Sequence, residues 1–338
     1  MRNNAAVGTK LCAMHKRMLT SEDFSKLIRF KSVNEIYEFL KKKEGYGKIL
    51  SSSSGGVHRE NIEAVLTNTI ISDLESIIHF LKDDDKKIMK FYFTEMEIEK
   101  LKSILRRIGA GTDFEVSKDF SGSKLGFDIK KVSEAKTIKE FIVALSGSVY
   151  QKPLLKLLSD TGHQTVFDAE MNLDMFYVTK HIDFLKNIKG AEEILEFSMI
   201  SADITNLLWI LRCKKYYSVA DEVIYSFMIN RFYKVSPGYL RSLVEAENSD
   251  ETEGLLKNGP YGMIFSNSDD IRPELKARRY FIKETEKVFK KERNSVTGAA
   301  AYIRLKMYEL IDLTSVIECV RYSVGAEETK KHLIRGVN

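Results

Sequence analysis

Three stretches of the sequence share one pattern and decide the fold: TEMEIEKLKSILRR at residues 94–107, ISADITNLLWILRC at 200–213 and KMYELIDLTSVIEC at 306–319. Each carries an acidic residue, an aliphatic residue, a leucine three positions later and then an aliphatic pair. The acidic residues are Glu97, Asp203 and Glu309, spaced 106 residues apart. Because the apolar positions fall on one face of a helix, we expect three copies of one helix, the signature helices.

A second element recurs upstream of each signature helix. A good helix-capping residue opens each copy, a glutamate follows three positions later, and a tyrosine comes shortly after the helix. This spacing predicts a capping box, in which the cap and the glutamate bond each other's backbone N–H groups. The copies are SVNEIYEFL (32–40, with Glu35 and Tyr46), TIKEFIVAL (137–145, with Glu140 and Tyr150) and NSDETEGLL (248–256, with Glu251 and Tyr261).

The repeat predicts the fold class and the domain organisation. A period of 106 residues is longer than the roughly 30–50 residues of common solenoid repeats, so each copy can bury a small core of its own. The chain holds only four prolines in 338 residues, which favours long helices because proline interrupts them. We expect an all-α protein of three homologous helical domains, over residues 1–115, 116–222 (with a polar connector at 109–136) and 223–338.

Polar stretches rich in Gly or Ser mark the expected loops, at 51–56, 109–136 and 258–273. Gly109 is expected to end the helix that precedes it. The segment FDIKKVS, at 127–133, could hold a short strand.

Composition limits the class of protein. Charged residues make up 30% of the chain, and the net charge is only +5, which fits weak attraction to anionic lipid or acidic partners rather than the focused patch of a nucleic-acid binder. The three cysteines, Cys12, Cys213 and Cys319, offer neither a disulfide framework nor a zinc pattern, so a reducing compartment is expected. No run looks like a signal peptide or a membrane span, so we expect a soluble, intracellular protein whose membrane association is peripheral.

No motif predicts catalysis. Residues 45–48 (GYGK) lack the spacing of a phosphate-binding loop, and Gly109-Ala110-Gly111 lacks the third glycine of a dinucleotide site. The aspartates at 83–85 lack the ligand pattern of a calcium loop, and no two histidines have the spacing of a helical metal pair. Cys213 and Cys319 share one repeat position without an identifiable base. We therefore expect no catalytic, cofactor-binding or metal-binding residues, and no small-molecule substrate.

Two sets of charged residues have either a structural or a binding role. Glu97, Asp203 and Glu309 recur with the repeat, which favours an internal ion pair or cap over contact with a partner. The basic pairs are expected to form a solvated face, the alternative being a surface for an acidic partner. They are Lys41-Lys42-Lys43, Arg106-Arg107, Lys130-Lys131, Lys214-Lys215, Arg278-Arg279 and Lys290-Lys291.

These patterns together resemble a known family. The stretch NAAVGTKLCAMHKRMLTSEDFSKLI (4–28), the capped helix before Tyr46, and the signature helices EIEKLKSILR (97–106), DITNLLWILR (203–212) and ELIDLTSVIE (309–318) are similar to the C subunits of prokaryotic V-type, or archaeal A-type, ATPases. That family is related to the d subunit of the vacuolar ATPase. The likeness runs from residue 4 to about residue 334. Gly8-Thr9-Lys10 stands where the family usually has arginine-rich spacing.

The resemblance implies an architecture and a role. It implies a funnel-shaped, all-helical body of three related domains with pseudo-threefold symmetry. It implies a non-catalytic rotor subunit on the cytoplasmic end of the membrane rotor ring, coupling the central stalk to the ring during proton or sodium transport, without cofactors. Its partners would be the stalk proteins, the ring and, peripherally, the membrane surface. A helical scaffold of another assembly is the alternative, and nucleic-acid binding, which rests only on net charge, is the weakest hypothesis.

Overall fold

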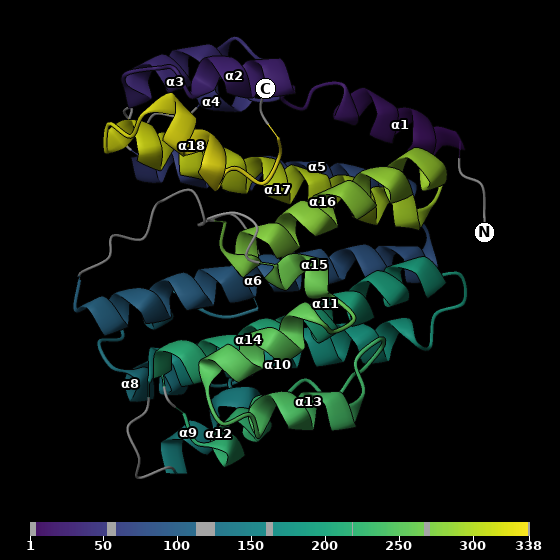
Figure 1. Cartoon of the computed structure of the whole chain (residues 1–338). Coiled ribbons are helices and arrows are strands. Elements are labelled where there is room, and N and C mark those ends of the chain that lie inside the picture. The colour runs from purple at the N-terminus through teal and green to yellow at the C-terminus, as the bar shows by residue number, and fades with distance from the viewer. Residues whose placement is uncertain are drawn as a thin grey trace. The chain divides into compact units, whose positions relative to one another are not determined.

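The computed structural model describes residues 5–52, 59–112, 126–159, 165–217, 219–266 and 271–336, and every regular element in these ranges is helical (Figure 1). The predicted all-α class is therefore confirmed. The helices are α1 (Ala5–His15), α2 (Ser21–Leu27), α3 (Val33–Lys41), α4 (Gly47–Ser52), α5 (Arg59–Phe80), α6 (Asp83–Ala110), α7 (Ile129–Ser133), α8 (Ile138–Ala144), α9 (Lys156–Ser159), α10 (Val166–Leu185), α11 (Glu192–Arg212), α12 (Asp221–Ser226), α13 (Pro237–Val244), α14 (Ser249–Lys257), α15 (Gly262–Phe265), α16 (Pro273–Glu292), α17 (Val296–Arg321) and α18 (Ala326–His332). A 3₁₀ turn at Lys152–Leu154 and a π-helical turn at Cys213–Tyr217 complete them.

The chain divides into two compact units. The first unit holds Met1–Met89 and Tyr261–Asn338, and the second holds Lys90–Pro260. The predicted division into three domains with pseudo-threefold symmetry is a finer statement, and it stays a prediction.

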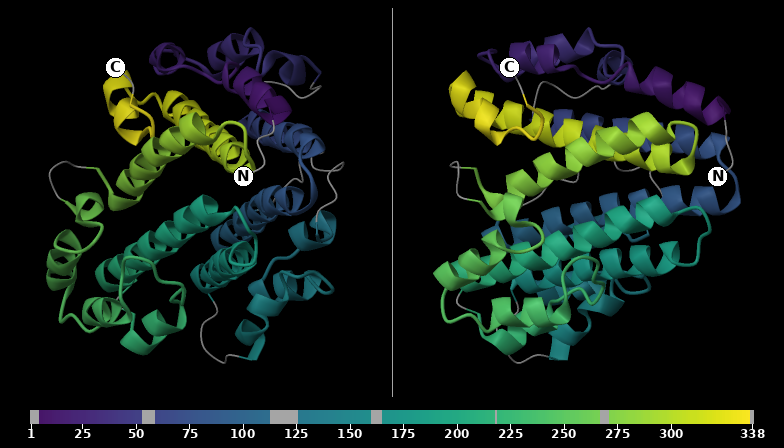
Figure 2. Two further views of the ribbon diagram at one scale, coloured as in Figure 1. Left: turned by 90° about the vertical axis from the view of Figure 1, so that its right-hand side faces the viewer. Right: turned by 45° about the vertical axis from the view of Figure 1, so that its right-hand side comes forward.

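The first unit joins the two ends of the sequence. Helix α17 packs against α5, α16, α1 and α3, and both views of Figure 2 show the yellow C-terminal helices beside the purple N-terminal ones. Side chains from both ends share one core, in which Phe24, Ile36 and Leu40 pack with Leu313 and Ile317. The burial of this apolar surface holds residues 19–50 on α17.

The second unit has two described cores. In one, the face of α6 that carries Ile98 and Leu105 packs against Phe141 and Ile142 of α8 and Leu173 of α10. In the other, α10 and α11 form an antiparallel hairpin around Ile182 and Ala202. The three signature helices are thus parts of α6, α11 and α17, and their apolar faces are buried as predicted.

The predicted caps are present, with one difference in detail. Ser32, Thr137 and Asn248 each accept a hydrogen bond from the backbone N–H of the glutamate three positions on. The glutamate side chains reach one residue further back than a capping box requires. Glu35, Glu140 and Glu251 accept from the N–H groups of Lys31, Lys136 and Glu247, at 2.7, 2.9 and 2.7 Å.

The polar connector at 109–136 differs from its prediction in two places. Helix α6 continues to Ala110, so Gly109 lies inside it, where a Cβ would stand 2.8 Å from Val166 Cγ2. The left-handed turn belongs to Gly111, with φ +63°. Residues 129–133 form α7, capped by Asp128, and not a strand, because the Asp128 carboxylate accepts from the N–H groups of Lys130 and Lys131.

Among the described residues, one helical stretch, Glu192–Tyr217, is long and apolar enough to cross a membrane by length and composition. The prediction that no run of the sequence looks like a membrane span is therefore wrong for this stretch, judged by length and composition alone. The stretch packs against α10, α13 and α14, and buries Asp203 and Asn206, whose polar atoms bond protein groups. Buried residues make up 44% of its most apolar window, and core helices pass the same test, so the stretch is weak evidence for a membrane span.

Candidate functional site

The acidic residue of the first signature helix holds the end of the polar connector and the segment after it. Glu97 accepts a hydrogen bond from the backbone N–H of Gly126 at 2.6 Å and another from the hydroxyl of Tyr150. Burial and the nearby Glu97 carboxylate raise the pKa of Tyr150, so its hydroxyl remains a donor. The carboxylate therefore fixes both ends of the segment that carries α7 and α8.

The acidic residue of the second signature helix also holds a following segment, by accepting hydrogen bonds from backbone N–H groups. Asp203 is fully buried and accepts from the N–H groups of Tyr233, Lys234 and Val235, at 3.1, 2.7 and 3.3 Å. These residues lead directly into the Ser236 cap of α13. A buried carboxylate is tolerated when such donors surround it.

The acidic residue of the third signature helix binds the N-terminal region. Glu309 is fully buried, and it accepts from the N–H of Leu19 at 2.7 Å and from the hydroxyl of Tyr46. Lys306 Nζ lies 2.7 Å from Glu309 Oε1, 2.8 Å from the Tyr46 hydroxyl and 4.1 Å from the centre of the Tyr46 ring. Burial raises the pKa of Tyr46 well above its usual value, so the hydroxyl stays protonated.

A polar residue one turn later in the same helices also holds backbone. Asn206 bonds both the N–H and the carbonyl of Ile229, at 2.8 and 2.9 Å. Asp312, at the equivalent position, accepts from the N–H groups of Ile334 and Arg335, at 2.6 and 3.2 Å. Sequence reasoning missed this second anchor, although a polar residue at one repeat position inside an apolar helix was its visible signal.

The anchors share one register. In each case a signature helix holds a capped pair, by which we mean two short helices that each begin at a capping residue. Helix α6 holds α7 and α8, α11 holds α13 and α14, and α17 holds α2 and α3. The hydrogen bonds thus join elements that the predicted repeat boundaries assign to neighbouring copies, and the structural role expected for Glu97, Asp203 and Glu309 is the one their contacts support.

Most of the basic pairs contain a side chain that bonds within the protein. Lys43 pairs with Asp23, Arg106 with Glu170, and Lys215 with Glu253. Lys214 bonds Asp221 and the carbonyl of Ala246, and Arg279 donates to the carbonyls of Lys331 and Leu333. These clusters are thus partly structural, which composition alone did not indicate.

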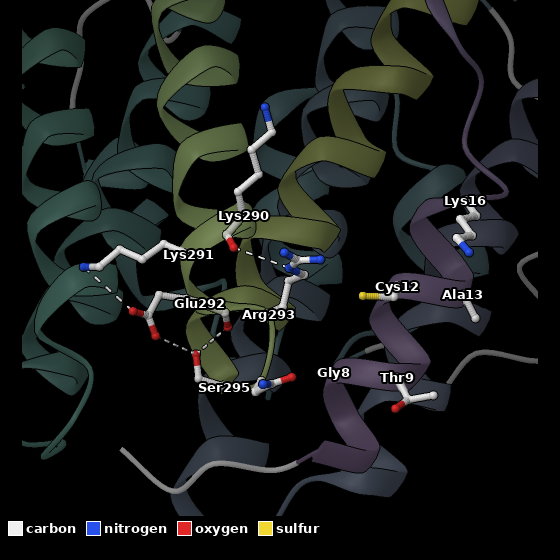
Figure 3. A pocket seen from close by; sticks show the side chains of 11 residues that line it. Gly8, Thr9, Cys12, Ala13, Lys16, Lys290, Lys291, Glu292, Arg293 and Ser295 are labelled. Atoms are coloured by element: carbon white, nitrogen blue, oxygen red, sulfur yellow. Dashed lines mark hydrogen bonds and ion pairs between the residues drawn. The ribbon is translucent and has the colours of Figure 1, made fainter.

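One open hollow of about 800 Å³ lies in the first unit, between α1 and the turn from α16 to α17 (Figure 3). Gly8, Thr9, Cys12, Ala13 and Lys16 line one side, and residues 290–295 line the other. Four lining side chains are basic, Lys16, Lys290, Lys291 and Arg293, and the single carboxylate, Glu292, pairs with Lys291 at 3.8 Å and accepts from Ser295. The hollow therefore suits an anionic group better than a cationic one.

The described residues hold no group of three His, Cys, Asp or Glu side chains that could bind a metal ion. Asp84 of the aspartate run pairs with Lys87. Cys213 is buried, and burial raises the pKa of its thiol, which favours a packing role over reactivity. The expected lack of catalytic, cofactor and metal residues stays a prediction.

A sequence profile described as "ATP synthase (C/AC39) subunit" matches residues 7–332. The chain belongs to this family. The C subunit of the A-type ATP synthase of Pyrococcus abyssi is 25% identical over 333 residues, which cover 95% of this chain and 88% of that protein. The corresponding A-type proteins of Methanosphaera stadtmanae and Methanocaldococcus jannaschii are each 22% identical, and each comparison covers 98% of this chain and 86% of the relative.

The C/AC39 family match covers all three signature helices and nearly all the anchored segments. At the N-terminus of this family member, Gly8 lies close to the α16–α17 turn: a Cβ there would lie 1.7 Å from the side-chain atom Asn294 Oδ1. His15 stacks on Phe289, with 4.6 Å between ring centres. In the sequence Gly8 is visible only as a departure from the family, and the structure places it against the Asn294 side chain of the α16–α17 turn.

Proposed function

We propose that this C/AC39-family chain is a non-catalytic rotor subunit of a V/A-type rotary ATPase. It sits on the cytoplasmic end of the membrane rotor ring and couples the central stalk to the ring during ATP-linked proton or sodium transport. The observation that carries the proposal is the family match, which extends over residues 7–332. The relatives named above are A-type ATP synthase subunits, and the same kind of complex supplies the partners proposed here.

The internal contacts suit this role. A part that passes torque must keep its shape under load, and each signature helix is tied to a capped pair by a carboxylate with two or more donors. Such hydrogen-bonded anchors rigidify a helical body. We propose further that the three repeats form three helical domains, and that the small positive net charge of +5 favours a peripheral seat near anionic headgroups.

The experiment compares the ATPase with and without this chain. In membranes from a deletion strain, ATP hydrolysis by the catalytic subunits should persist while ion transport, followed with a pH- or sodium-sensitive dye, is lost. Adding back the purified chain should restore transport. Transport that remains fully coupled without the chain would contradict the proposal.

Binding assays separate this proposal from the alternative. The chain should bind the purified central-stalk subunits and the purified rotor ring in separate pull-downs. Cross-linking in cells that captures another assembly, with no binding to stalk or ring, would favour the scaffold alternative. A steep dependence of nucleic-acid affinity on salt concentration would favour nucleic-acid binding instead.

A further inference from the structure

The third capped pair reaches its signature helix from the opposite end of the sequence. Glu97 and Asp203 bind backbone N–H groups 29 and 31 residues downstream, at Gly126 and Lys234. Glu309 instead binds Leu19, 290 residues upstream. We call the contact between residues 19–50 and α17 the seam. Closing so long a segment costs more chain entropy than closing a short one. The seam therefore needs additional contacts compared with the other two joints, by which we mean the contacts of α6 with α7 and α8 and of α11 with α13 and α14.

A buried cation, Lys306, is present at the seam, and neither equivalent position of the other signature helices holds one. The side chain of Lys306 is 3% exposed and that of its partner Glu309 is 0% exposed. Thr94 and Ile200 occupy the position of Lys306 in the other two signature helices, and neither carries a charge. Arg335 adds a second cation, 3.2 Å from Asp312, and donates to the carbonyl of Leu19 at 3.0 Å.

These charges discriminate between partners more than they add stability. A buried ion pair contributes little net stability compared with well-packed apolar groups, but it is costly when one partner is missing. The signature helices present similar apolar faces, so a capped pair could in principle dock on any of them. If α2 and α3 docked elsewhere, Glu309 and Lys306 would lose Leu19 and Tyr46 and remain buried with fewer partners.

We propose that Lys306 and Arg335, with Tyr46, Glu309 and Asp312, form a latch that sets the register of the N-terminal capped pair on α17. At the other two joints, a short chain connection keeps the capped pair close to its signature helix. At the seam, the latch has this role. Lys306 and Arg335 are positioning residues, and their effect is expected at residues 19–50.

The first test is Lys306→Met in the full chain, followed by hydrogen–deuterium exchange. Amides in residues 19–50 should exchange at least about tenfold faster, while residues 126–159 and 219–257 keep their rates. The matched control is Lys102→Met, which removes a buried lysine that bonds Glu99 and Asp174 at a joint with a short connection. The control should leave residues 19–50 unchanged.

The second test supplies the missing connection. Residue 338 is linked to residue 1 through about 12 flexible residues, which can extend to roughly 40 Å. In this cyclised chain, Lys306→Met should accelerate exchange in residues 19–50 much less than in the open chain. If Lys306→Met does not fold, Arg335→Gln gives the same test, because the Arg335 side chain is only 15% exposed and touches Leu19.

Two outcomes would overturn the latch. One is an even acceleration throughout the first unit, which would make Lys306 an ordinary core residue. The other is an equal acceleration in the open and the cyclised chain, which would show that the cluster does not substitute for chain connection. Neither result bears on stalk or ring binding, so the proposed function stands or falls separately.

Discussion

The hydroxyl of Tyr46 donates to the carboxylate of Glu309 across 263 positions of sequence, while the hydroxyl of Tyr150 donates to Glu97 across 53. Both tyrosines follow a capped pair, and both carboxylates belong to signature helices. The two contacts are therefore copies of one arrangement. They differ in surroundings, because the Tyr46 hydroxyl also accepts from Lys306 at 2.8 Å.

This difference predicts unequal costs for removing the two hydroxyls. Tyr150→Phe should lower the free energy of unfolding of the second unit by about 1.5–2 kcal/mol, the lower part of the range for a hydrogen bond to a charged group, because Glu97 is only half-buried. Tyr46→Phe should cost the first unit about 2–4 kcal/mol, because a buried lysine and a buried carboxylate each lose a partner.

Urea unfolding with two probes checks the prediction. The only tryptophan, Trp209, lies in the second unit. The unfolding midpoint followed by its fluorescence should therefore fall with Tyr150→Phe and stay unchanged with Tyr46→Phe. The unfolding transition followed by circular dichroism, which reports on the helices of both units, should shift to lower urea with either variant. Equal costs for the two variants would mean that Lys306 does not depend on Tyr46.

The second anchor predicts an asymmetry between Asn206 and Asp312. Asp312 only accepts hydrogen bonds, so Asp312→Asn keeps an acceptor for Ile334 and should cost about 1–2 kcal/mol, mainly through its weaker contact with Arg335. Asn206 must also donate to the Ile229 carbonyl. Asn206→Asp removes that donor and buries a new charge, so it should cost about 3 kcal/mol or more. Similar costs for the two exchanges would contradict the assigned donor at Asn206.

Local patterns in the sequence predicted the local structure well. The signature helices and the three caps each depend on residues within two or three turns of one another, and those interactions are set by spacing alone. Gly109 shows where this ends, because a glycine that terminates a helix and one that admits Val166 at close range look alike in a sequence.

The pairing of capped pairs with signature helices could not be predicted in the same way. Glu97, Asp203 and Glu309 look equivalent, and nothing local indicates that Glu309 takes its partner from residues 19–46. Lys306 carried the missing information, because a lysine that replaces threonine and isoleucine at one repeat position needs a buried acceptor. The role of Lys306 follows from its burial, which the sequence does not show and the structure does.

The ion pair between Lys102 and Asp174 predicts a pH dependence. Lys102 Nζ lies 3.0 Å from Asp174 Oδ1, yet burial outweighs this attraction and raises the pKa of Asp174 to about 6. An unfolded aspartate titrates near pH ~3.9, so between these values the folded chain binds more protons. Stability should therefore fall as the pH rises from about 4 to about 6.

The check compares the native chain with Asp174→Asn, whose amide does not titrate. The free energy of unfolding of the native chain, measured relative to the variant, should be highest at pH 4, fall up to pH 6 and then stay constant. Because the Asp174 side chain is still 31% exposed, solvent should reduce the size of the change. A relative stability that rises over this range would show that Lys102 outweighs burial.

The packing of Gly8 against Asn294 predicts a substitution whose sign depends on its background. Gly8→Ala places a Cβ 1.7 Å from Asn294 Oδ1, and the next backbone atom, the Arg293 carbonyl oxygen, lies at 3.5 Å. In the native background, the Asn294 side chain must turn aside, and stability should fall by up to about 1 kcal/mol. With Asn294→Ala, the clash disappears. Alanine is about 1 kcal/mol better than glycine inside a helix, so Gly8→Ala should then stabilise the first unit by up to that amount.

A double-mutant cycle by chemical unfolding, read by circular dichroism, measures this coupling between Gly8 and Asn294. The reversal of sign is the deciding result. If Gly8→Ala destabilises the chain equally in both backgrounds, then a contact other than the one with Asn294 sets the distance between α1 and the α16–α17 turn.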